Sequence, residues 1–200
     1  MQTEIEQCEL CRKRFPELAV NCPPGHIPPK SPPPNPVKVL FIGVAPPEKG
    51  RHFYTDPQDK LRRGLFRVLK ELGRPCDGVD DLDFIPFLNN RFFLLHTAKC
   101  AIRGTTSPSL PMSQFCASHH LKREIETLLP TAVCWLSSNV GHPVCQSLSR
   151  EWGVTNNVPF GKVTPVPIKG RSVYFVATYW PGRGWEKDTK VHLSELFTML

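Results

Sequence analysis

Residues 37–57 read VKVLFIGVAPPEKGRHFYTDP, and this stretch decides the fold class. Its first seven residues, 37–43, are an apolar run with β-branched side chains that ends at a glycine. Such a run is typical of a strand buried on both faces of a parallel sheet. The loop that follows, residues 43–57, lacks the G-x-G-x-x-G pattern and the G-K-S/T ending of phosphate-binding loops. It is therefore either a plain turn or the wall of a pocket.

Similar apolar runs recur along the chain, and helical patterns lie between them. The runs are residues 91–98, 132–136 and 173–178. Apolar spacing predicts helices over 61–72, over a segment that ends near 129 with a cap at Ser113, over 140–152 and over 187–199. Strands that alternate with helices predict an α/β fold of three layers, αβα, around a central, mostly parallel four-stranded sheet.

The carboxyl ends of parallel strands are where such folds bind their ligands. Four segments are expected at this edge of the sheet: residues 43–57, 97–100, 137–139 and 179–184. We therefore expect the functional side chains to come from these four segments.

The proline content divides the chain into an arm and a main fold. Residues 22–36, CPPGHIPPKSPPPNP, hold eight of the 22 prolines and cannot form a regular helix or a central strand. We interpret residues 1–36 as a cysteine-bearing arm with a proline-rich connector, and residues 37–200 as the α/β domain. Together they form one structural domain.

Charge and hydropathy indicate the class of partner. With 25 Lys and Arg against 18 Asp and Glu, the 200-residue chain carries a net charge of +7. A basic surface of this kind favours nucleic acid as the partner. Neither a signal peptide nor an apolar run of membrane-spanning length occurs, so we expect a cytoplasmic protein without a membrane partner. We also expect a monomer.

Four cysteines have the spacing of a metal centre. Cys8 and Cys11 form a C-x2-C pair, and fifteen residues separate Cys100 from Cys116. The two pairs converge if the arm folds back over the helix that carries Cys116. Four thiolates suit tetrahedral zinc or a cubane iron-sulfur cluster, and spacing does not choose between them.

The other four cysteines and a second interpretation of Cys100 and Cys116 bear on the predicted metal site. Cys22 also lies in the arm and competes as the fourth ligand, whereas three others fit buried structural positions: Cys76, Cys134 and Cys145. In the alternative, Cys100 and Cys116 are small buried apolar residues, as free cysteine often is.

These cysteines and four short motifs together resemble the iron-sulfur uracil-DNA glycosylases of families four and five. In those enzymes the same C-x2-C and C-x15-C arrangement holds a 4Fe-4S cluster. Residues 43–46, GVAP, are similar to the GLAP or GEAP that opens their first motif, and residues 53–56, FYTD, to the FTGD that closes it. Residues 130–139 fall where the family has a strand and a helix start. Residues 177–181, ATYWP, occupy the place of the second motif, which usually ends in His-Pro-Ser.

The resemblance extends from Cys8 to about Leu196 and implies the glycosylase fold, DNA as partner and a cluster on Cys8, Cys11, Cys100 and Cys116. In the first motif it implies that Gly43, Val44 and Ala45 shape the base pocket, that Phe53 stacks on the flipped base, and that Asp56 orients water. Phe53 is alternatively a core residue. Asp56 is alternatively a helix cap, in which case Glu48 and Asp59 are the nearest substitute carboxylates.

Two positions carry a residue type that differs from the one common in the family. His96 stands where the family commonly has an Asn that reads the base edge, and an imidazole can donate or accept there. Trp180 replaces the histidine that stabilises the leaving base, and an indole cannot become a cation. The loop that follows brings Arg183 and Trp185, which are candidates to push into the duplex in place of the extruded base. An ordinary turn is the alternative for this loop.

Basic residues outside these motifs are candidate phosphate contacts: Lys99, Arg103, Lys122, Arg123 and Lys162. Each of them is alternatively a plain solvated charge.

The sequence thus predicts a monofunctional DNA glycosylase that leaves an abasic site. Its substrate is uracil or another deaminated base, or a modified base such as a phage modified cytosine. One alternative is a non-catalytic iron-sulfur module that binds nucleic acid, and another is a zinc protein with an unrelated task. Loss of the second-motif histidine favours the non-catalytic module, and retention of Phe53 with Asp56 opposes it.

Overall fold

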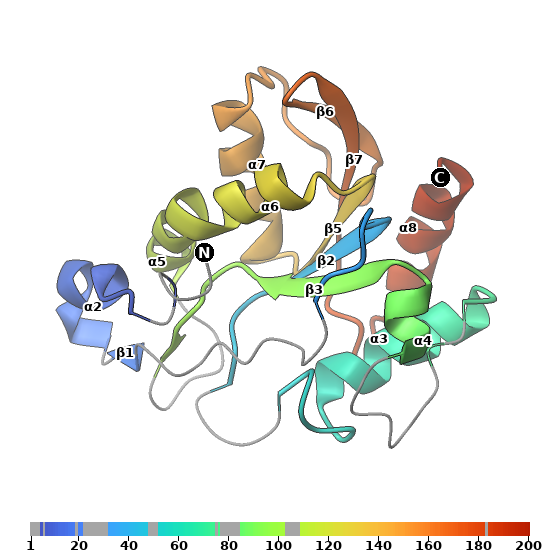
Figure 1. Cartoon of the computed structure of the whole chain (residues 1–200), viewed down its shortest axis with the longest axis horizontal. Helices are drawn as coiled ribbons and strands as arrows, with labels where there is room; N and C mark the ends of the chain where they lie inside the picture. Colours follow the sequence, from blue (N-terminus) through green and yellow to red (C-terminus); the bar gives the residue numbers. More distant parts are fainter. Residues whose placement is uncertain are drawn as a thin grey trace.

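The structure is a computed structural model that describes residues 5, 7–18, 20–21, 32–47, 52–74, 76, 85–102, 109–182 and 184–200. Within these residues the central sheet has five strands in the order β3-β2-β5-β7-β6 (Figure 1). Four of them are parallel and β6 is antiparallel. The strands are β2 (Val39–Gly43), β3 (Phe92–His96), β5 (Ala132–Leu136), β6 (Thr164–Ile168) and β7 (Arg171–Thr178).

The three-layer α/β prediction is confirmed, but the predicted number of four strands is wrong. The missing strand is β6, TPVPI, whose two prolines argue against a central strand. It lies at the edge of the sheet, where proline is tolerated because no ladder donor is needed on the open side. Val166 and Ile168 of this strand face the core, and the two prolines are exposed.

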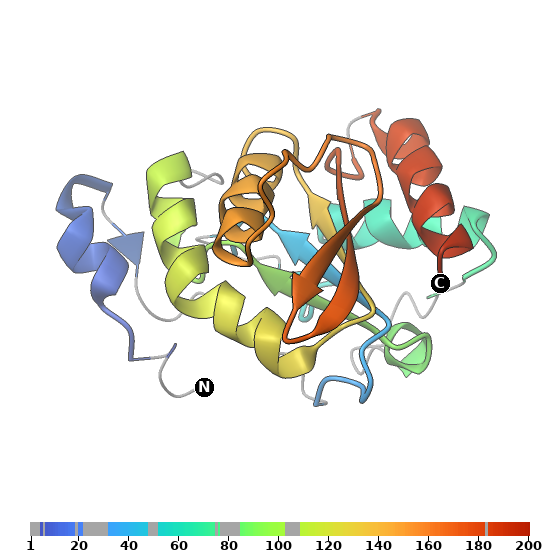
Figure 2. The ribbon, with the colours of Figure 1, turned by 90° about the horizontal axis from the view of Figure 1, so that it is seen from above.

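Helices cover both faces of the sheet (Figure 2). One face packs against the continuous segment of α5 (Leu110–Cys116), a π-helical turn (Ala117–Leu121) and α6 (Lys122–Leu128), together with α7 (Gly141–Glu151). The other face packs against α3 (Lys60–Glu71), α4 (Ile85–Asn89) and α8 (Glu186–Thr198). Burial on both faces explains why β2, β3 and β5 are continuous apolar runs.

Two helix starts differ from the predicted capping. Asp59 caps α3, and its side chain accepts a hydrogen bond from the Arg62 backbone N–H at 2.8 Å. Ser109 caps α5 through the Met112 N–H, so the predicted cap at Ser113 is wrong because that residue lies buried inside the helix. The helix therefore begins earlier than its apolar pattern indicates.

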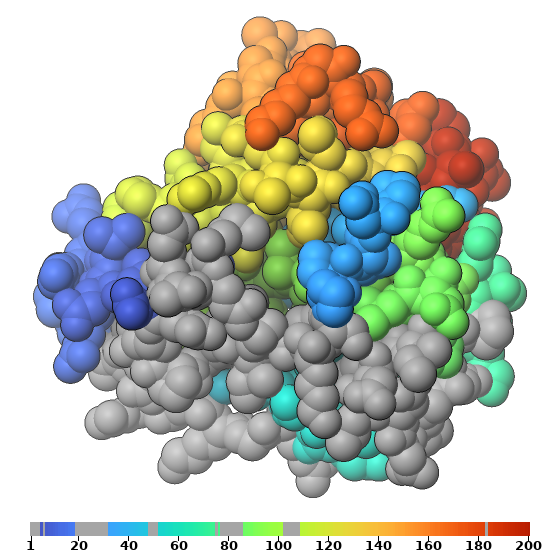
Figure 3. Space-filling view, viewed as in Figure 1, coloured from blue at the N-terminus to red at the C-terminus, as the bar shows by residue number. Residues whose placement is uncertain are grey.

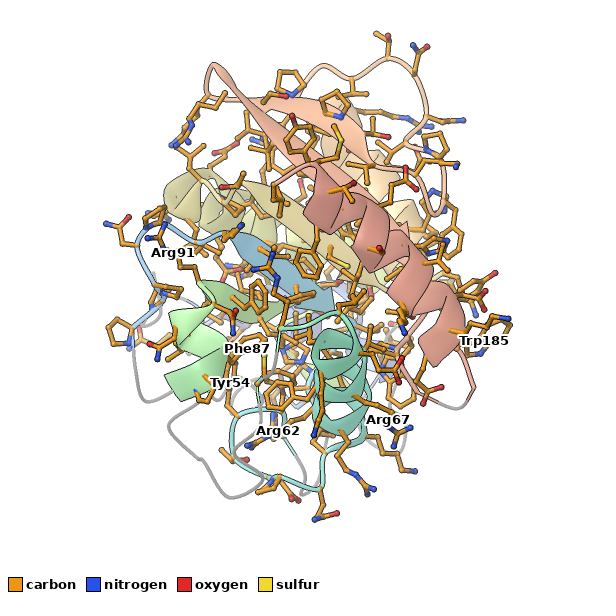
Figure 4. The ribbon with its side chains drawn as sticks, turned by 90° about the vertical axis from the view of Figure 1, so that its right-hand side faces the viewer. Tyr54, Arg62, Arg67, Phe87, Arg91 and Trp185 are labelled. Atoms are coloured by element: carbon orange, nitrogen blue, oxygen red, sulfur yellow. The ribbon has the colours of Figure 1, made fainter. Side chains whose placement is uncertain are left out.

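A tyrosine from the first-motif loop closes the open edge of β3. The Tyr54 hydroxyl donates to the Leu94 carbonyl and accepts from the Leu94 N–H, both at 2.8 Å. Burial raises the pKa of Tyr54 well above its ordinary value, so the phenol stays protonated. Figure 4 shows Tyr54 beneath β3, near Phe87 of α4. The hydroxyl thus satisfies backbone groups that an edge strand leaves unpaired.

The arm packs at the side of the domain that carries α5 (Figure 3). It contains α2 (Leu10–Arg14), a 3-10 turn (Pro16–Leu18) and β1 (Val20–Asn21), which pairs antiparallel with β4 (Ala101–Ile102). None of the helices in the described ranges has the length and apolar character that crossing a membrane requires.

Candidate functional site

The loops that follow β2 and β3 are joined by hydrogen bonds at the carboxyl edge of the sheet. The Gly43 carbonyl accepts from the backbone N–H of Thr97 at 2.8 Å and from its hydroxyl at 3.0 Å. The Val44 carbonyl accepts from the Ala98 N–H at 2.9 Å. Two of the four segments expected at this edge, residues 43–57 and 97–100, are therefore held side by side.

His96 lies across the end of β2, where a glycine makes room for it. A Cβ atom added to Gly43 would lie 3.0 Å from His96 Cδ2 and 3.3 Å from the Leu61 side chain of α3. His96 itself is 9% exposed. Glycine at this position therefore lets the His96 imidazole and the first turn of α3 meet at the edge of the sheet.

The turn before α3 fixes Asp56. Its N–H donates to the His52 carbonyl at 2.9 Å, and its Oδ1 accepts from the Gln58 N–H at 2.7 Å. The alternative that Asp56 caps α3 is wrong, because Asp59 has that role. Asp56 is half-buried, so its carboxylate can be reached from solvent. Burial raises the pKa of Asp59, while backbone hydrogen bonds from Arg62 and Leu61 oppose the shift.

Phe53 is a core residue in this structure, although charged residues stand close to it in the sequence. It is 2% exposed. Its ring packs edge-on against three aromatic side chains, Tyr54, Phe66 and Phe87, with centroids 5.0–5.8 Å away. This packing favours the core alternative over an open stacking wall.

Trp180 lines a basic hollow beside α3. A Cβ on Gly182 would overlap the Trp180 ring, and a Cβ on Gly64 would overlap the Pro181 carbonyl oxygen, so helix and loop approach closely. The hollow has a volume of about 150 Å³ and is lined by Lys60, Arg63, Gly64, Arg67, Trp180, Gly182 and Glu186. The indole thus borders cationic side chains of α3.

Trp185 directly precedes α8, and its ring stacks on Tyr179. The two ring centroids are 4.3 Å apart and the planes differ by 15°. Trp185 is 46% exposed. The other residue predicted for this loop, Arg183, lies outside the described residues, as does the substitute carboxylate Glu48.

Three of the four predicted cluster cysteines meet in one buried group. Cys11, Cys100 and Cys116 are each at most 5% exposed and pack with Ala98 and Met112. The Cys11 and Cys116 thiols are hydrogen-bonded to each other, which raises the pKa of Cys11 and lowers that of Cys116. The arm therefore folds over α5, as convergence of the two pairs requires.

Cys8 lies at the outer side of this group. Its half-buried sulfur is 3.2 Å from His120 Nε2, on the π-helical turn directly after Cys116. A hollow of about 470 Å³ opens beside it, lined by Gln7, Cys8, Glu9, Leu10, Lys13, His119, His120 and Arg123. Of the four sulfurs, this one therefore lies closest to solvent.

The cysteine side chains do not have the geometry of a formed metal site. Among the described residues, no group of three or more His, Cys, Asp or Glu side chains has metal-binding geometry. Cys100 is disulfide-bonded, and the competing candidate Cys22 lies outside the described residues. The number, softness and burial of the thiols fit a four-thiolate site, provided that Cys100 is reduced.

A comparison with known families decides the identity of the fold. The sequence profile of the uracil DNA glycosylase superfamily matches residues 29–190, most of the chain. The chain belongs to the uracil-DNA glycosylase superfamily. Members of this superfamily are DNA glycosylases and act on DNA. No curated protein matches the chain.

One predicted DNA contact of this superfamily member is wrong. Lys99 is 3% exposed, and its ammonium forms an ion pair with Glu124 at 2.5 Å, so it cannot reach a phosphate on the surface. Burial raises the pKa of Glu124, an effect that Lys99 opposes. The backbone N–H of Lys99 donates to Cys116 Sγ at 3.3 Å, so this residue supports the cysteine group.

The other candidate phosphate contacts of the glycosylase fold differ in their surroundings. Arg123 and Lys162 are exposed, Lys122 pairs with Glu126 at 2.8 Å, and Arg103 lies outside the described residues.

Sequence reasoning missed the basic face of α3. Lys60, Arg63 and Arg67 recur at i, i+3 and i+7 and therefore share one side of the helix. The apolar spacing of this segment, which faces the core, predicts only the helix. The charged spacing is the signal that would have indicated a basic surface.

Proposed function

We propose that this protein is a monofunctional DNA glycosylase with Asp56 as the carboxylate that orients water. The observation that carries the proposal is that Asp59, and not Asp56, caps α3. Asp56 is partly accessible to solvent, and it lies in the loop that leads into α3. The first turn of this helix meets Gly43 and His96 at the edge of the sheet. Membership of the uracil-DNA glycosylase superfamily supports the reaction class.

The proposed reaction is hydrolysis of the bond between the base and the sugar. The base leaves with the electron pair of the N-glycosidic bond and takes up a proton. Water oriented by Asp56 forms the new bond to C1′ and loses its proton, and the carboxylate offsets the positive charge that develops on the sugar. The product is an abasic site and a free base. A Schiff-base lysine has no part in this scheme.

His96 is the proposed reader of the base edge, in a pocket with walls formed by Gly43, Val44 and Ala45. Its imidazole lies over Gly43 at the end of β2, where a Cβ atom would lie 3.0 Å from the ring and crowd it. An imidazole can donate to or accept from a pyrimidine edge, depending on its tautomer.

The tryptophan in the second motif, Trp180, favours a base other than unmodified uracil as the substrate. Trp180 cannot supply the cation that stabilises a poor leaving group, and it borders the basic hollow beside α3. The exchange of a histidine for an indole at this position favours a base other than uracil. Modified cytosines, such as those in phage DNA, and deaminated bases other than uracil are the candidates.

The proposed cofactor is a 4Fe-4S cluster held by Cys8, Cys11, Cys100 and Cys116, with a zinc ion as the alternative. When bound, it would supply a cross-link between the arm and α5. The convergence of Cys11, Cys100 and Cys116 in one buried group supports this proposal. An anaerobically purified iron-sulfur protein is brown, whereas a zinc protein is colourless.

A panel of oligonucleotides tests the reaction. Duplexes and single strands that carry uracil, hypoxanthine, xanthine or a modified cytosine are incubated with the protein and then treated with alkali, which breaks abasic sites. We expect cleavage at the modified position of at least one substrate. Failure on every substrate in both forms would sink the catalytic proposal.

The second candidate is a non-catalytic DNA-binding module, which the burial of Phe53 and the position of Trp180 favour. It predicts binding to the same panel without any abasic product. Asp56→Asn separates the two, because in the catalytic case it abolishes cleavage and leaves binding in place.

A further inference from the structure

Trp185 presents one ring face outward. It is one of four large apolar residues that are exposed in the described part of the chain. Figure 4 shows it projecting from the molecule at the start of α8. Tyr179 covers the opposite face in a nearly parallel stack at 4.3 Å. The two rings therefore form a flat platform with a single open side.

Hydrogen bonds hold this platform in place. The Thr189 hydroxyl, which is buried, contacts the Tyr179 carbonyl at 3.1 Å and the Trp185 carbonyl at 3.0 Å. The Gly184 N–H donates to Glu186 Oε2 at 3.0 Å. A preformed stack loses little side-chain freedom when it binds a ligand.

Cationic side chains lie next to the platform. Glu186, which follows Trp185, accepts from Arg67 of α3 at 3.3 Å and lines the hollow that also contains Lys60 and Arg63. One acidic residue thus faces three basic ones. Such a surface favours a phosphate chain, and the aromatic platform beside it favours a base.

We propose that the Tyr179–Trp185 platform and the α3 hollow bind an unpaired base and its neighbouring phosphates in single-stranded DNA. This site borders the proposed glycosidic pocket at Trp180, and it rests on the proposed function only for the choice of DNA as ligand. A wedge inserted between two base pairs needs both of its ring faces open. Because Tyr179 occupies one face of Trp185, the wedge role predicted for Trp185 gives way to stacking of one unpaired base.

Binding of undamaged oligonucleotides tests the site without any turnover. Fluorescence anisotropy compares a labelled single strand with its duplex for the wild type, Trp185→Ala, Trp185→Phe and the control Val191→Ala, which changes another exposed apolar residue of α8. We expect Trp185→Ala to weaken single-strand binding roughly tenfold and duplex binding less than about twofold. Trp185→Phe should retain most of the affinity, and Val191→Ala all of it.

If Trp185→Ala weakens binding to the single strand and to the duplex equally, Trp185 is a wedge and the proposal is overturned. The proposal is also overturned if this variant binds both as tightly as the wild type does. A second readout needs no variant: a 2-aminopurine within the single strand should lose fluorescence when the wild type binds, and unchanged fluorescence contradicts stacking. These measurements use no damaged base. Single-strand binding can therefore be found when the glycosylase test fails, and the glycosylase test can succeed when single-strand binding is absent.

Discussion

Two regions of the molecule differ in burial and in expected role. We call them the cysteine region, which consists of Cys8, Cys11, Cys100 and Cys116, and the strand-end loops, which are residues 43–47, 52–59 and 179–182. The cysteine region joins distant parts of the sequence, and three of its sulfurs are at most 5% exposed. The strand-end loops instead keep Asp56 and Trp180 partly accessible. Substitutions in the first region should therefore change stability and metal content, and substitutions in the second should change the reaction.

The largest expected effect belongs to Asp56→Ala. If its carboxylate orients water, the single-turnover rate should fall roughly a hundredfold or more. The melting temperature should fall only slightly, because the variant also loses the hydrogen bond from the exposed Gln58 N–H. The matched control is Asp59→Ala, which removes the cap of α3 and should lower the unfolding free energy by about 1 kcal/mol with little change in rate. An unchanged rate in Asp56→Ala would move the catalytic role elsewhere.

Cys116→Ser tests the cysteine region. After anaerobic reconstitution under reducing conditions, the wild type should hold about four irons per chain and the variant almost none. Cys134→Ser changes an equally buried thiol in β5 and should keep its iron. Equal iron in both variants, measured by a colorimetric assay, would refute a cluster on this group.

Gly64→Ala tests how the strand-end loops are held. Its Cβ would overlap the Pro181 carbonyl, so the loop must shift, at a cost of about 1–3 kcal/mol in unfolding free energy measured with urea. Arg63→Ala, at the exposed neighbouring position, should change stability far less. A fully stable Gly64→Ala would show that α3 and this loop do not meet as described.

The smallest effect concerns pH. Burial lowers the pKa of His192 below its ordinary value of 6.5, and its Nδ1 lies 2.8 Å from the Thr178 hydroxyl. Because the unfolded chain binds a proton more readily, stability should fall as the pH drops below about 6.5. His192→Asn should flatten this slope, whereas His119→Asn, at an exposed position, should not. Identical slopes in both variants would exclude His192 as the cause.

Sequence reasoning succeeded where a pattern has one physical cause. Residues 132–136 were predicted as a strand with the bounds that β5 has, because a short apolar run between polar residues fits little else. The spacing of the cysteine pairs allows them to converge if the arm folds back, and three of the four, Cys11, Cys100 and Cys116, do lie in one buried group. The strand β6 was missed because its edge position, which makes proline tolerable, is a property of the sheet and not of the segment.

Long-range packing accounts for the failures at the site. The charged neighbours of Phe53 do not reveal that Phe66 and Phe87 surround its ring. Nothing next to Lys99 in sequence indicates its ion pair with Glu124 on a distant helix. The burial of both residues depends on contacts with other elements, which adjacent positions in the sequence do not show.

Mass spectrometry of the reaction products tests the central claim most directly. The wild type is incubated with the single oligonucleotide of the panel that it cleaves best, or with the pooled panel, and the products are analysed without alkali. A monofunctional glycosylase predicts two products, the free base and an intact strand whose mass is that of an abasic site. Intact substrate alone, or a strand already broken at the modified position, would contradict it.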